Sequence, residues 1–447
     1  MIISDGTQAN YSDLKSEKVQ ELINRIGDDC DISKSKKMQK VLKTDGAVLE
    51  KNYDDLQING ECPKCGVFPA SKPDGNDDER QCKTCTKLIE IGQKLVKSAK
   101  VVLKCEKLRH FSDMVELYEW DRDVKFYYSV NEYKPGQPLM NLPYVAPKFE
   151  YFSNEEKTSM NLDNERIENI DGDALLTFEE ISNLSSGNKK LAMFKADIDN
   201  LGLVFSQSLK KRLSFSRYAG LSHQLHYFFS SFYAWFVNNH SDNIGIPYKN
   251  RIYTVFSGGD DLCILGSWDA VMQFAYDFQK ELCKFTNNNK SVSISGGIAL
   301  VNSKLPVRNI AEEAESLLEK SKGKDEKNAI TVFGTTVSWS EYEKCLIDGR
   351  FLDKMLKNEK ISTSVVYKFI DFANRAEKTL GKKNSVADVS ELVNPKNRIW
   401  KSNMIYILAR NVTDKELNEK LKSFGASAES MIKSRIAVSY ALYMNRK

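Results

Sequence analysis

Two acidic turns carry the clearest chemistry in this sequence. The first, Asp197-Ile-Asp199, follows an apolar run, and the second, Ser257-Gly-Gly-Asp-Asp261, lies between two apolar runs. Paired glycines allow positive φ and let the backbone approach a ligand closely, so the second turn is typical of a tight hairpin. Asp-rich turns also occur for turn formation alone. Two of them together are a stronger indication of a functional site.

Carboxylates that gather at such turns repel one another unless a divalent cation lies among them. Hard oxygen ligands suit Mg²⁺ or Mn²⁺. Two of these ions, about 3.5–4 Å apart, can activate a sugar hydroxyl and stabilise a leaving pyrophosphate without a dedicated protein base. The residue types therefore indicate metal-dependent nucleotidyl transfer, provided that the fold brings the two turns together.

Four of the nine cysteines form two pairs, Cys62-x-x-Cys65 and Cys82-x-x-Cys85, with sixteen residues between the pairs. This spacing is a strong signature of tetrahedral Zn²⁺, because each pair offers two thiolates. A four-cysteine site has no open coordination position, so we expect a structural zinc that cross-links a loop-rich segment. Redox-active or vestigial cysteines are the alternative. The other five cysteines are scattered singly, which suits reduced thiols in the cytoplasm.

Composition excludes several classes of protein. The 447 residues carry a formal net charge of +4, which is too small to predict nucleic-acid binding from charge alone. A hydrophobic content of 41% with 28% charged residues argues against global disorder. No apolar window is long enough for a membrane helix, and the first residues lack the layout of a signal peptide. We therefore expect a cytoplasmic protein of about three domains.

The elements that must position the acidic turns lie in residues 190–335. The pattern predicts strands over 191–196, 251–256, 262–266, 291–301 and 329–333, and helices over 207–238, 268–285 and 307–322. This order is the ferredoxin-like split βαβ arrangement with additions. The first strand and the hairpin are neighbours in such a sheet, so Asp197 and the Asp260–Asp261 pair are expected to converge on one edge. Residues after Ser338 show helical stripes to the end of the chain.

Residues 173–335 resemble the second palm domain of the large signature subunit of type III CRISPR effector complexes, most closely the III-A subtype. The motifs that carry the resemblance are Leu176-Thr-Phe-Glu-Glu-Ile181, Ala196-Asp-Ile-Asp-Asn-Leu-Gly202, Gly258-Gly-Asp-Asp261, Ser293-Ile-Ser-Gly-Gly-Ile298 and Lys320-Ser-Lys322 followed by Lys327-Asn328. The cysteine pairs and the helical tail also lie where that family has a zinc-binding insertion and a carboxyl-terminal helical domain.

The fold class implied is α+β, with a ferredoxin-like palm or cyclase domain, a four-cysteine zinc-binding insertion and a carboxyl-terminal helical bundle. The expected domains are the tail of a preceding palm-like domain (1–50), a zinc-binding domain with connecting strands (51–172), the second palm with its Gly-Gly-Asp-Asp hairpin (173–340) and a helical domain (341–447).

The resemblance implies a cyclic oligoadenylate synthase that uses ATP as substrate and is switched on when the complex binds target RNA. By the same resemblance, Asp197, Asp260 and Asp261 are the catalytic residues and hold Mg²⁺ or Mn²⁺. Asp199 is a further candidate metal ligand.

The family also suggests how the nucleotide is held. Gly258 and Gly259 are expected to pass close to the triphosphate, Lys322 and Lys327 to bind phosphate, and Ser230 to meet the adenine base. A solvated helix end is the alternative for the two lysines. For Ser230, which lies in an aromatic helix, the alternative is a packing role.

The implied partners are other III-A effector subunits, both small and guide-binding, and through them guide RNA and target RNA, with no membrane. In the family an HD nuclease domain and a first palm precede the zinc region, and residues 1–50 can supply at most the end of that palm. We therefore expect an amino-terminal half with the first palm, in cis or in trans. None of the four histidines is followed by Asp, so DNA cleavage by an HD domain is not assigned to this sequence.

Two other functions remain open. The first is a non-catalytic scaffold in the same complex, whose nucleotide site is idle. The second is a diguanylate-type cyclase, which shares the fold. Those enzymes have a Gly-Gly-acidic-Glu-Phe turn, whereas Leu262 follows Asp261 here.

Overall fold

The computed structural model describes residues 50–98, 100–106, 114–121, 124–130, 139–141, 145–159, 174–208, 214–323, 327–380, 397 and 399–446, and positions 21, 22, 24, 25, 28 and 32. Most of the expected segment 1–50 lies outside these residues. The chain forms two compact units. The first combines Met1–Tyr144 with Gly202–His226, and the second combines Val145–Leu201 with Tyr227–Lys447.

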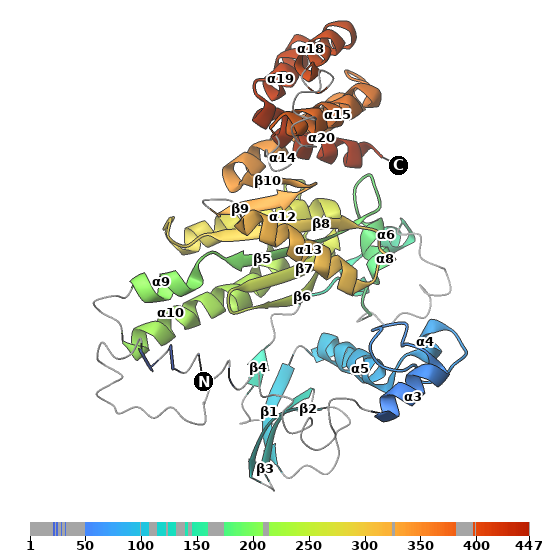
Figure 1. The fold of residues 1–447 in the computed structure, drawn as a ribbon, viewed down its shortest axis with the longest axis vertical. Coiled ribbons are helices and arrows are strands. Elements are labelled where there is room, and N and C mark those ends of the chain that lie inside the picture. The colour runs from blue at the N-terminus through green and yellow to red at the C-terminus, as the bar shows by residue number, and fades with distance from the viewer. Residues whose placement is uncertain are drawn as a thin grey trace. The chain divides into compact units, whose positions relative to one another are not determined.

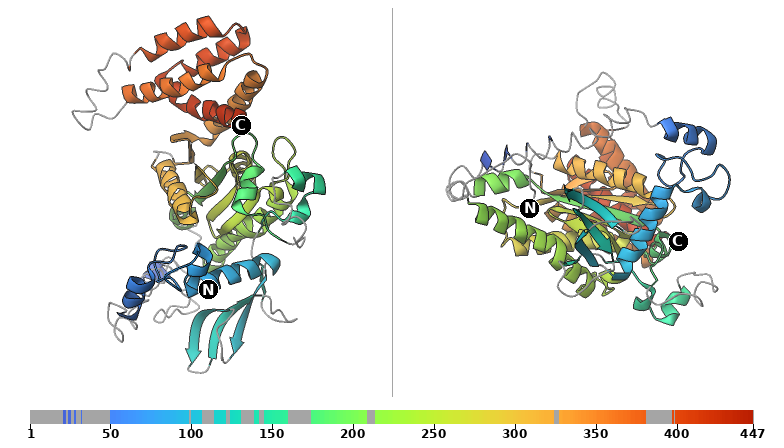
Figure 2. Two further views of the ribbon diagram at one scale, coloured as in Figure 1. Left: turned by 90° about the vertical axis from the view of Figure 1, so that its right-hand side faces the viewer. Right: turned by 90° about the horizontal axis from the view of Figure 1, so that it is seen from below.

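The first unit contains the cysteine-rich segment and a small antiparallel sheet in the order β2-β3-β1-β4. Helix α5 packs against β3 of this sheet, as Figure 2 shows. Most of α9 (Leu201–Ser208) and α10 (Phe215–Tyr227) also belongs to this unit. The remaining elements are α3 (Glu50–Asn59), α4 (Asp77–Arg80), α5 (Lys83–Ser98), β1 (Lys100–Glu106), β2 (Met114–Asp121), β3 (Val124–Val130) and β4 (Leu139–Asn141).

The second unit is built on a six-stranded sheet in the order β10-β9-β8-β5-β7-β6 (Figure 1). Its strands are β5 (Leu191–Ile198), β6 (Ile252–Gly258), β7 (Asp261–Ser267), β8 (Ile294–Val301), β9 (Ala329–Val332) and β10 (Thr335–Ser338). All neighbours are antiparallel except β8 and β9. The inner order, β8-β5-β7-β6, is the ferredoxin-like arrangement, so the predicted fold class is confirmed.

One face of this sheet carries helix α13 (Val307–Lys322). Met193 of β5 packs in one buried cluster with Ile310 and Ala314 of that helix. Successive strand residues alternate between the two faces of a sheet. Lys195 and Asp197 therefore lie on the same face as Met193, beneath α13.

The predicted helical region over 207–238 consists of several elements. Helix α9 begins earlier, at Leu201, and α10 is followed by a π-helical turn, η3 (Phe228–Phe232), and by α11 (Tyr233–Asn239). Phe229 packs on the ring of Phe278 in α12 (Trp268–Phe285). The π-helical turn inserts an extra residue into the helix, which no apolar periodicity in the sequence reveals.

The carboxyl-terminal helices share one buried core, which includes Leu352, Phe369, Met404 and Leu421. These helices are α14 (Trp339–Lys357), α15 (Thr363–Leu380), α18 (Trp400–Asn411), α19 (Lys415–Phe424) and α20 (Ala428–Asn445). Arg435 links them to the sheet, since it donates hydrogen bonds to residues of both β10 and α15. No helix in the described ranges is long and apolar enough to cross a membrane.

The remaining elements are short. A capping box at Thr177 starts helix α8 (Phe178–Asn183). The others are η2 (Phe149–Tyr151), α6 (Asn154–Ser159) and η4 (Tyr248–Asn250).

The sequence prediction missed strand β10. Phe333 and Gly334 both have positive φ, 49° and 71°, and form a two-residue turn between paired strands. Such a turn suits two residues with positive φ. Its sequence signal is weak because a phenylalanine seldom adopts this conformation.

The close packing of α13 on β8 gives a testable prediction. A Cβ atom on Gly297 would lie 2.4 Å from the backbone nitrogen of Leu318. We expect Gly297→Ala to destabilise the second unit by about 1–3 kcal/mol, because the obstruction is helix backbone that cannot rotate away. Chemical denaturation followed by circular dichroism measures the shift in midpoint.

Gly220→Ala is the matched control, because a Cβ at Gly220 meets no atom within 4 Å. It lies inside α10, where alanine is a better helix former than glycine, and we expect an unchanged or higher midpoint. Equal midpoints for native protein and Gly297→Ala would contradict the close approach of α13.

Candidate functional site

Three carboxylates meet at the edge of the six-stranded sheet. Asp197 is the penultimate residue of β5, and it pairs directly with Asp261, the first residue of β7. Asp260 precedes it in the turn of the β6–β7 hairpin. One oxygen from each carboxylate lies within 4.8 Å of the other two. The strand register therefore brings together the three aspartates that the sequence singled out.

Because the three carboxylates lie so close together, ionising all of them costs free energy. Burial, together with the charge of Asp197, raises the pKa of Asp260. Burial, a hydrogen bond with Asp197 and the two neighbouring charges raise the pKa of Asp261 to about 7. A divalent cation among the three oxygens would remove the repulsion, and carboxylate oxygens are the ligands that Mg²⁺ and Mn²⁺ prefer. The residues fit such an ion.

One ammonium group already lies at this site. Nζ of Lys322, in the last turn of α13, is 2.7 Å from Oδ2 of Asp197 and 3.5 Å from Oε1 of Glu319. Burial opposes the charge of this lysine, but the contacts with Asp197 and Glu319 outweigh it and raise its pKa. The ionised cluster of three aspartates and one lysine carries a net charge of −2, which still attracts a divalent cation.

A polar cavity of about 290 Å³ adjoins the carboxylates. Asp197, Asp261 and Lys322 line it, together with Lys195 and Glu315, which form an ion pair. The sequence prediction missed this pair. Its spacing could have indicated it, because Lys195 is two residues before Asp197 on a strand and Glu315 is seven residues before Lys322 on a helix, so each lies on the same face as its neighbour in the site.

Asp199 does not join the cluster. Its side chain is 2% exposed, and Oδ2 accepts hydrogen bonds from the Ser293 hydroxyl at 2.8 Å and from the Asn328 backbone N–H at 3.0 Å. The aspartate lies beyond the end of β5, so the alternation that places Asp197 on the α13 face no longer determines its direction. The structure thus separates the two acidic residues of the first turn.

The other residues assigned to the nucleotide lie at the hairpin, in the π-helical turn and in the loop before β9. Gly259 has a φ of 69° at the turn, and a Cβ on either Gly258 or Gly259 would meet no atom within 4 Å. Ser230 lies in the π-helical turn and is 8% exposed. The hydroxyl of Ser257 donates a hydrogen bond to the carbonyl of Phe229, which ties this turn to β6. Lys327 donates a hydrogen bond to Oδ1 of Asn200, 2.7 Å away.

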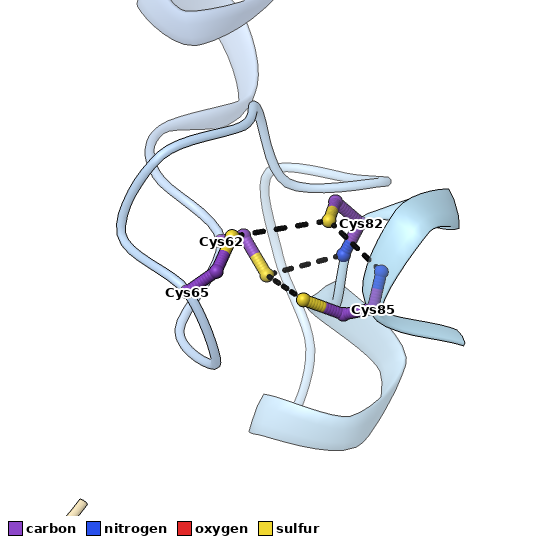
Figure 3. A group of neighbouring side chains, drawn as sticks. All are labelled: Cys62, Cys65, Cys82 and Cys85. Atoms are coloured by element: carbon purple, nitrogen blue, oxygen red, sulfur yellow. Dashed lines mark hydrogen bonds between the residues drawn. The ribbon is translucent and has the colours of Figure 1, made fainter. Parts of the chain in front are cut away.

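The four cysteines of the first unit form a second cluster (Figure 3). The sulfurs of Cys62 and Cys85 are 3.9 Å apart, those of Cys65 and Cys82 are 4.0 Å apart, and all four lie within 4.8 Å of one another. A tetrahedral metal with bonds of about 2.3 Å to sulfur requires sulfur–sulfur distances of about 3.8 Å. The cluster therefore has the dimensions of a tetrahedral thiolate site.

Backbone groups favour a thiolate in this cluster. Burial opposes ionisation of Cys62, but backbone N–H donors from Cys82, Cys65 and Lys64 outweigh it and lower its pKa to about 6. Burial and hydrogen bonds with the neighbouring cysteines raise the pKa of Cys85. Four thiolates so close together would repel one another without a cation, so the site can hold a metal.

Comparison with known proteins finds relatives of the region that contains the three aspartates. The family model described as Cas10/Cmr2, second palm domain, matches residues 190–331. The chain is 31% identical, over 230 residues, to the CRISPR system single-strand-specific deoxyribonuclease Cas10/Csm1 (subtype III-A) of Methanocaldococcus jannaschii, covering 47% of this chain and 27% of that protein. Its counterpart in Thermococcus onnurineus is 26% identical over 315 residues, covering 64% and 38%.

Solved structures with a similar fold include assemblies of Csm1 with Csm4. The apo Csm1–Csm4 cassette matches with a TM-score of 0.56 at 16% identity, over 97% of this chain and 55% of that chain. The cassette in complex with pppApApA matches with a TM-score of 0.53 at 17% identity, over 81% and 51%. The matches thus span about half of those chains and less than half of the curated relatives. The chain is similar to part of the Cas10/Csm1 proteins of subtype III-A, and its residues 190–331 match the second palm domain of the Cas10/Cmr2 family.

Proposed function

We propose that this chain provides a nucleotidyltransferase site that makes cyclic oligoadenylates from ATP, within a type III-A CRISPR effector complex that target RNA activates. The observation that carries the proposal is the convergence of Asp197, Asp260 and Asp261 on a second palm domain. Solved relatives with the same fold are described in complex with AMPPNP, with one ATP and with pppApApA, so adenine nucleotides are the ligand class of that fold.

In this proposal the three aspartates hold Mg²⁺ or Mn²⁺. The metal supplies Lewis-acid activation of a ribose hydroxyl and charge stabilisation of the leaving pyrophosphate. Lys322 contacts an oxygen of Asp197 in the described structure, and its ammonium would be available to the triphosphate if that oxygen held a metal. The positive charge of Lys322 would thus favour phosphate binding when a nucleotide is present. When the nucleotide is absent, the same charge partly offsets the negative charge of the three carboxylates.

In this proposal, residues of the hairpin, of the π-helical turn and of the loop before β9 position the nucleotide. Gly258 and Gly259 present backbone without a side chain, which lets a triphosphate approach the turn. Lys327 adds a second basic group, and Ser230 offers a hydroxyl toward the adenine. Of these residues, only Ser230 would distinguish the base, because the glycines and the lysine contact the triphosphate that every nucleotide shares.

We assign Zn²⁺ to the four-cysteine cluster. The sulfur–sulfur distances fit a tetrahedral ion, and the site leaves no open position for a substrate. The ion cross-links two loops whose described residues bury few large apolar side chains. Its role is to stabilise the segment between Cys62 and Cys85.

The partners that we propose follow from the relatives. Solved Csm1 chains are described in assemblies with Csm4, and the curated relatives are CRISPR proteins of subtype III-A. Guide RNA, target RNA and the small subunits reach this chain through such a complex. A first palm, in cis or in trans, completes the nucleotide site.

A non-catalytic scaffold is the competing function. It does not explain why three carboxylates converge with a lysine beside a polar cavity, since a hairpin with only a structural role gains nothing from that repulsion. A diguanylate-type cyclase is disfavoured by Leu262 after Asp261 and by the homology to Cas10/Csm1. The relatives are named deoxyribonucleases, and we do not extend that activity to the residues described in this chain.

The raised pKa of Asp261 predicts a pH-dependent metal affinity. Protons compete with the metal for a carboxylate whose pKa is about 7. We expect Mn²⁺ to bind about tenfold more weakly at pH 6 than at pH 8, as measured by isothermal titration calorimetry. Asp261→Asn should bind more weakly at both pH values and lose most of the pH dependence. Equal affinity of the native chain at pH 6 and pH 8 would contradict a metal site that includes Asp261.

The cysteine cluster predicts one zinc ion for each chain. Elemental analysis of protein purified without chelator should give one equivalent. Cys65→Ser should lower it, because a hydroxyl is a much weaker ligand than a thiolate. Cys345→Ser is the matched control, since Cys345 is a buried cysteine of α14 outside the cluster. Native protein without zinc, or unchanged zinc in Cys65→Ser, would refute the assignment.

The proposed reaction is tested in the reconstituted effector complex with guide and target RNA. Mass spectrometry of products formed from ATP with Mg²⁺ or Mn²⁺ should detect cyclic oligoadenylates. The double variant Asp260→Ala/Asp261→Ala should abolish them, because the metal loses two of three carboxylates. Asp371→Ala, an exposed carboxylate of α15, should leave the yield unchanged.

The assembly of both complexes is checked by size-exclusion chromatography and by RNA content. If neither native nor variant complex makes a product although both are assembled and bind target RNA, the scaffold is the correct function. If the double variant retains full activity, the catalytic metals lie elsewhere.

A further inference from the structure

Asp199 is held by two loops that are distant in the sequence. Its carboxylate oxygen Oδ2 accepts hydrogen bonds from the Ser293 hydroxyl, before β8, and from the Asn328 N–H, before β9. Its own backbone N–H donates to the carbonyl of Ser293 at 2.8 Å. One buried carboxylate therefore joins the end of β5 to the beginnings of β8 and β9, the next two strands on that side of the sheet.

The neighbouring residues repeat this connection. Nζ of Lys327 donates to Oδ1 of Asn200, so residues 199–200 and 327–328 are linked twice. Asn200, Lys327 and Asn328 have φ values of 53°, 47° and 45°. Residues with a Cβ adopt this left-handed conformation at a cost and keep it where surrounding contacts hold it. The hydrogen bonds to Asp199 and Asn200 are contacts of this kind.

Asp199 is separate from the metal-binding carboxylates. It lies two residues after Asp197 but is absent from the cluster formed with Asp260 and Asp261. Within the described residues it forms no ion pair, and its oxygen Oδ1 is buried without a hydrogen-bond partner. In the part of the chain that the structure describes, the side-chain hydrogen bonds of Asp199 go to these two loops.

We propose that Asp199 is a positioning residue, which holds the end of β5 so that Asp197 points into the metal site, and is not itself a metal ligand. This inference rests on the proposed function only in taking Asp197 as a metal ligand. Ligating carboxylates depend on hydrogen-bonded groups behind them, and loss of such a group commonly weakens metal binding 10–100-fold. Asp199 has this role through the backbone of residues 197–199.

Two measurements on the full chain test the proposal. The first is hydrogen–deuterium exchange of the segment 327–332. Asn328 lines a cavity of about 440 Å³, so its amide meets solvent once the carboxylate no longer holds it. The second is Mn²⁺ affinity by electron paramagnetic resonance. Asp199→Ala should speed exchange in this segment and weaken Mn²⁺ binding about tenfold.

Asp199→Asn separates positioning from ligation. The amide oxygen can still accept both hydrogen bonds, and the amide nitrogen replaces an oxygen that has no partner. We expect Mn²⁺ affinity and exchange within about twofold of the native chain, whereas Asp260→Asn loses most of its Mn²⁺ affinity. Asp371→Ala controls for loss of a distant carboxylate. Ser293→Ala removes one of the two donors, so it should show a smaller effect than Asp199→Ala in both measurements. It replaces Asp199→Ala in the test if Asp199→Ala does not fold.

The outcomes are distinct. If Asp199→Asn loses as much Mn²⁺ affinity as Asp260→Asn, Asp199 is a ligand and the proposal is wrong. Unchanged exchange and unchanged Mn²⁺ affinity in Asp199→Ala would also overturn the proposal. If Asp199→Ala does not fold, the same result in Ser293→Ala would overturn it. If the native chain binds no Mn²⁺, the proposed metal site is wrong, and so is the role of Asp199 in positioning a metal ligand. The exchange experiment would still show whether Asp199 holds the two loops.

Discussion

Electrostatic repulsion among three carboxylates is the constraint on which this structure depends. The pairing of Asp197 with Asp261 in neighbouring strands fixes two of the charges side by side, and the hairpin adds Asp260. The strand register keeps the backbones of Asp197 and Asp261 side by side, so their carboxylates remain neighbours. The site lowers its energy by raising the pKa values of Asp260 and Asp261, by the contact with Lys322, or by binding a cation. This accumulation of negative charge is what the metal-dependent reaction that we propose requires.

Other parts of the second unit hold the residues of this site in place. Helix α13 delivers Lys322 to Asp197, and it can lie that close because Gly297 leaves room for its backbone. Loops on the far side of β5 hold Asp199 and so the end of the strand. The π-helical turn is tied to β6 by the hydrogen bond from Ser257 to Phe229, which brings Ser230 near the hairpin's strand. Each of these links joins segments that are far apart in the sequence.

Much of the fold could be predicted from the sequence, because its signals are local. The helices over 268–285 and 307–322 have the predicted bounds, and the glycine pair marks the hairpin. The convergence of Asp197 with the hairpin followed from the ferredoxin-like order alone. The contact between Lys322 and Asp197 could not be predicted in the same way, since it depends on where α13 crosses the sheet. The separate position of Asp199 depends on the strand ending at Ile198, which periodicity does not determine to one residue.

The most direct test of the account is a crystal structure of the chain with Mn²⁺ and a non-hydrolysable ATP analogue, with anomalous scattering to locate the metal. We expect an anomalous peak bonded to oxygens of Asp197, Asp260 and Asp261, with Nζ of Lys322 moved from Asp197 toward the triphosphate. A peak at another place, or an Asp197–Lys322 contact that persists with the analogue bound, would contradict it.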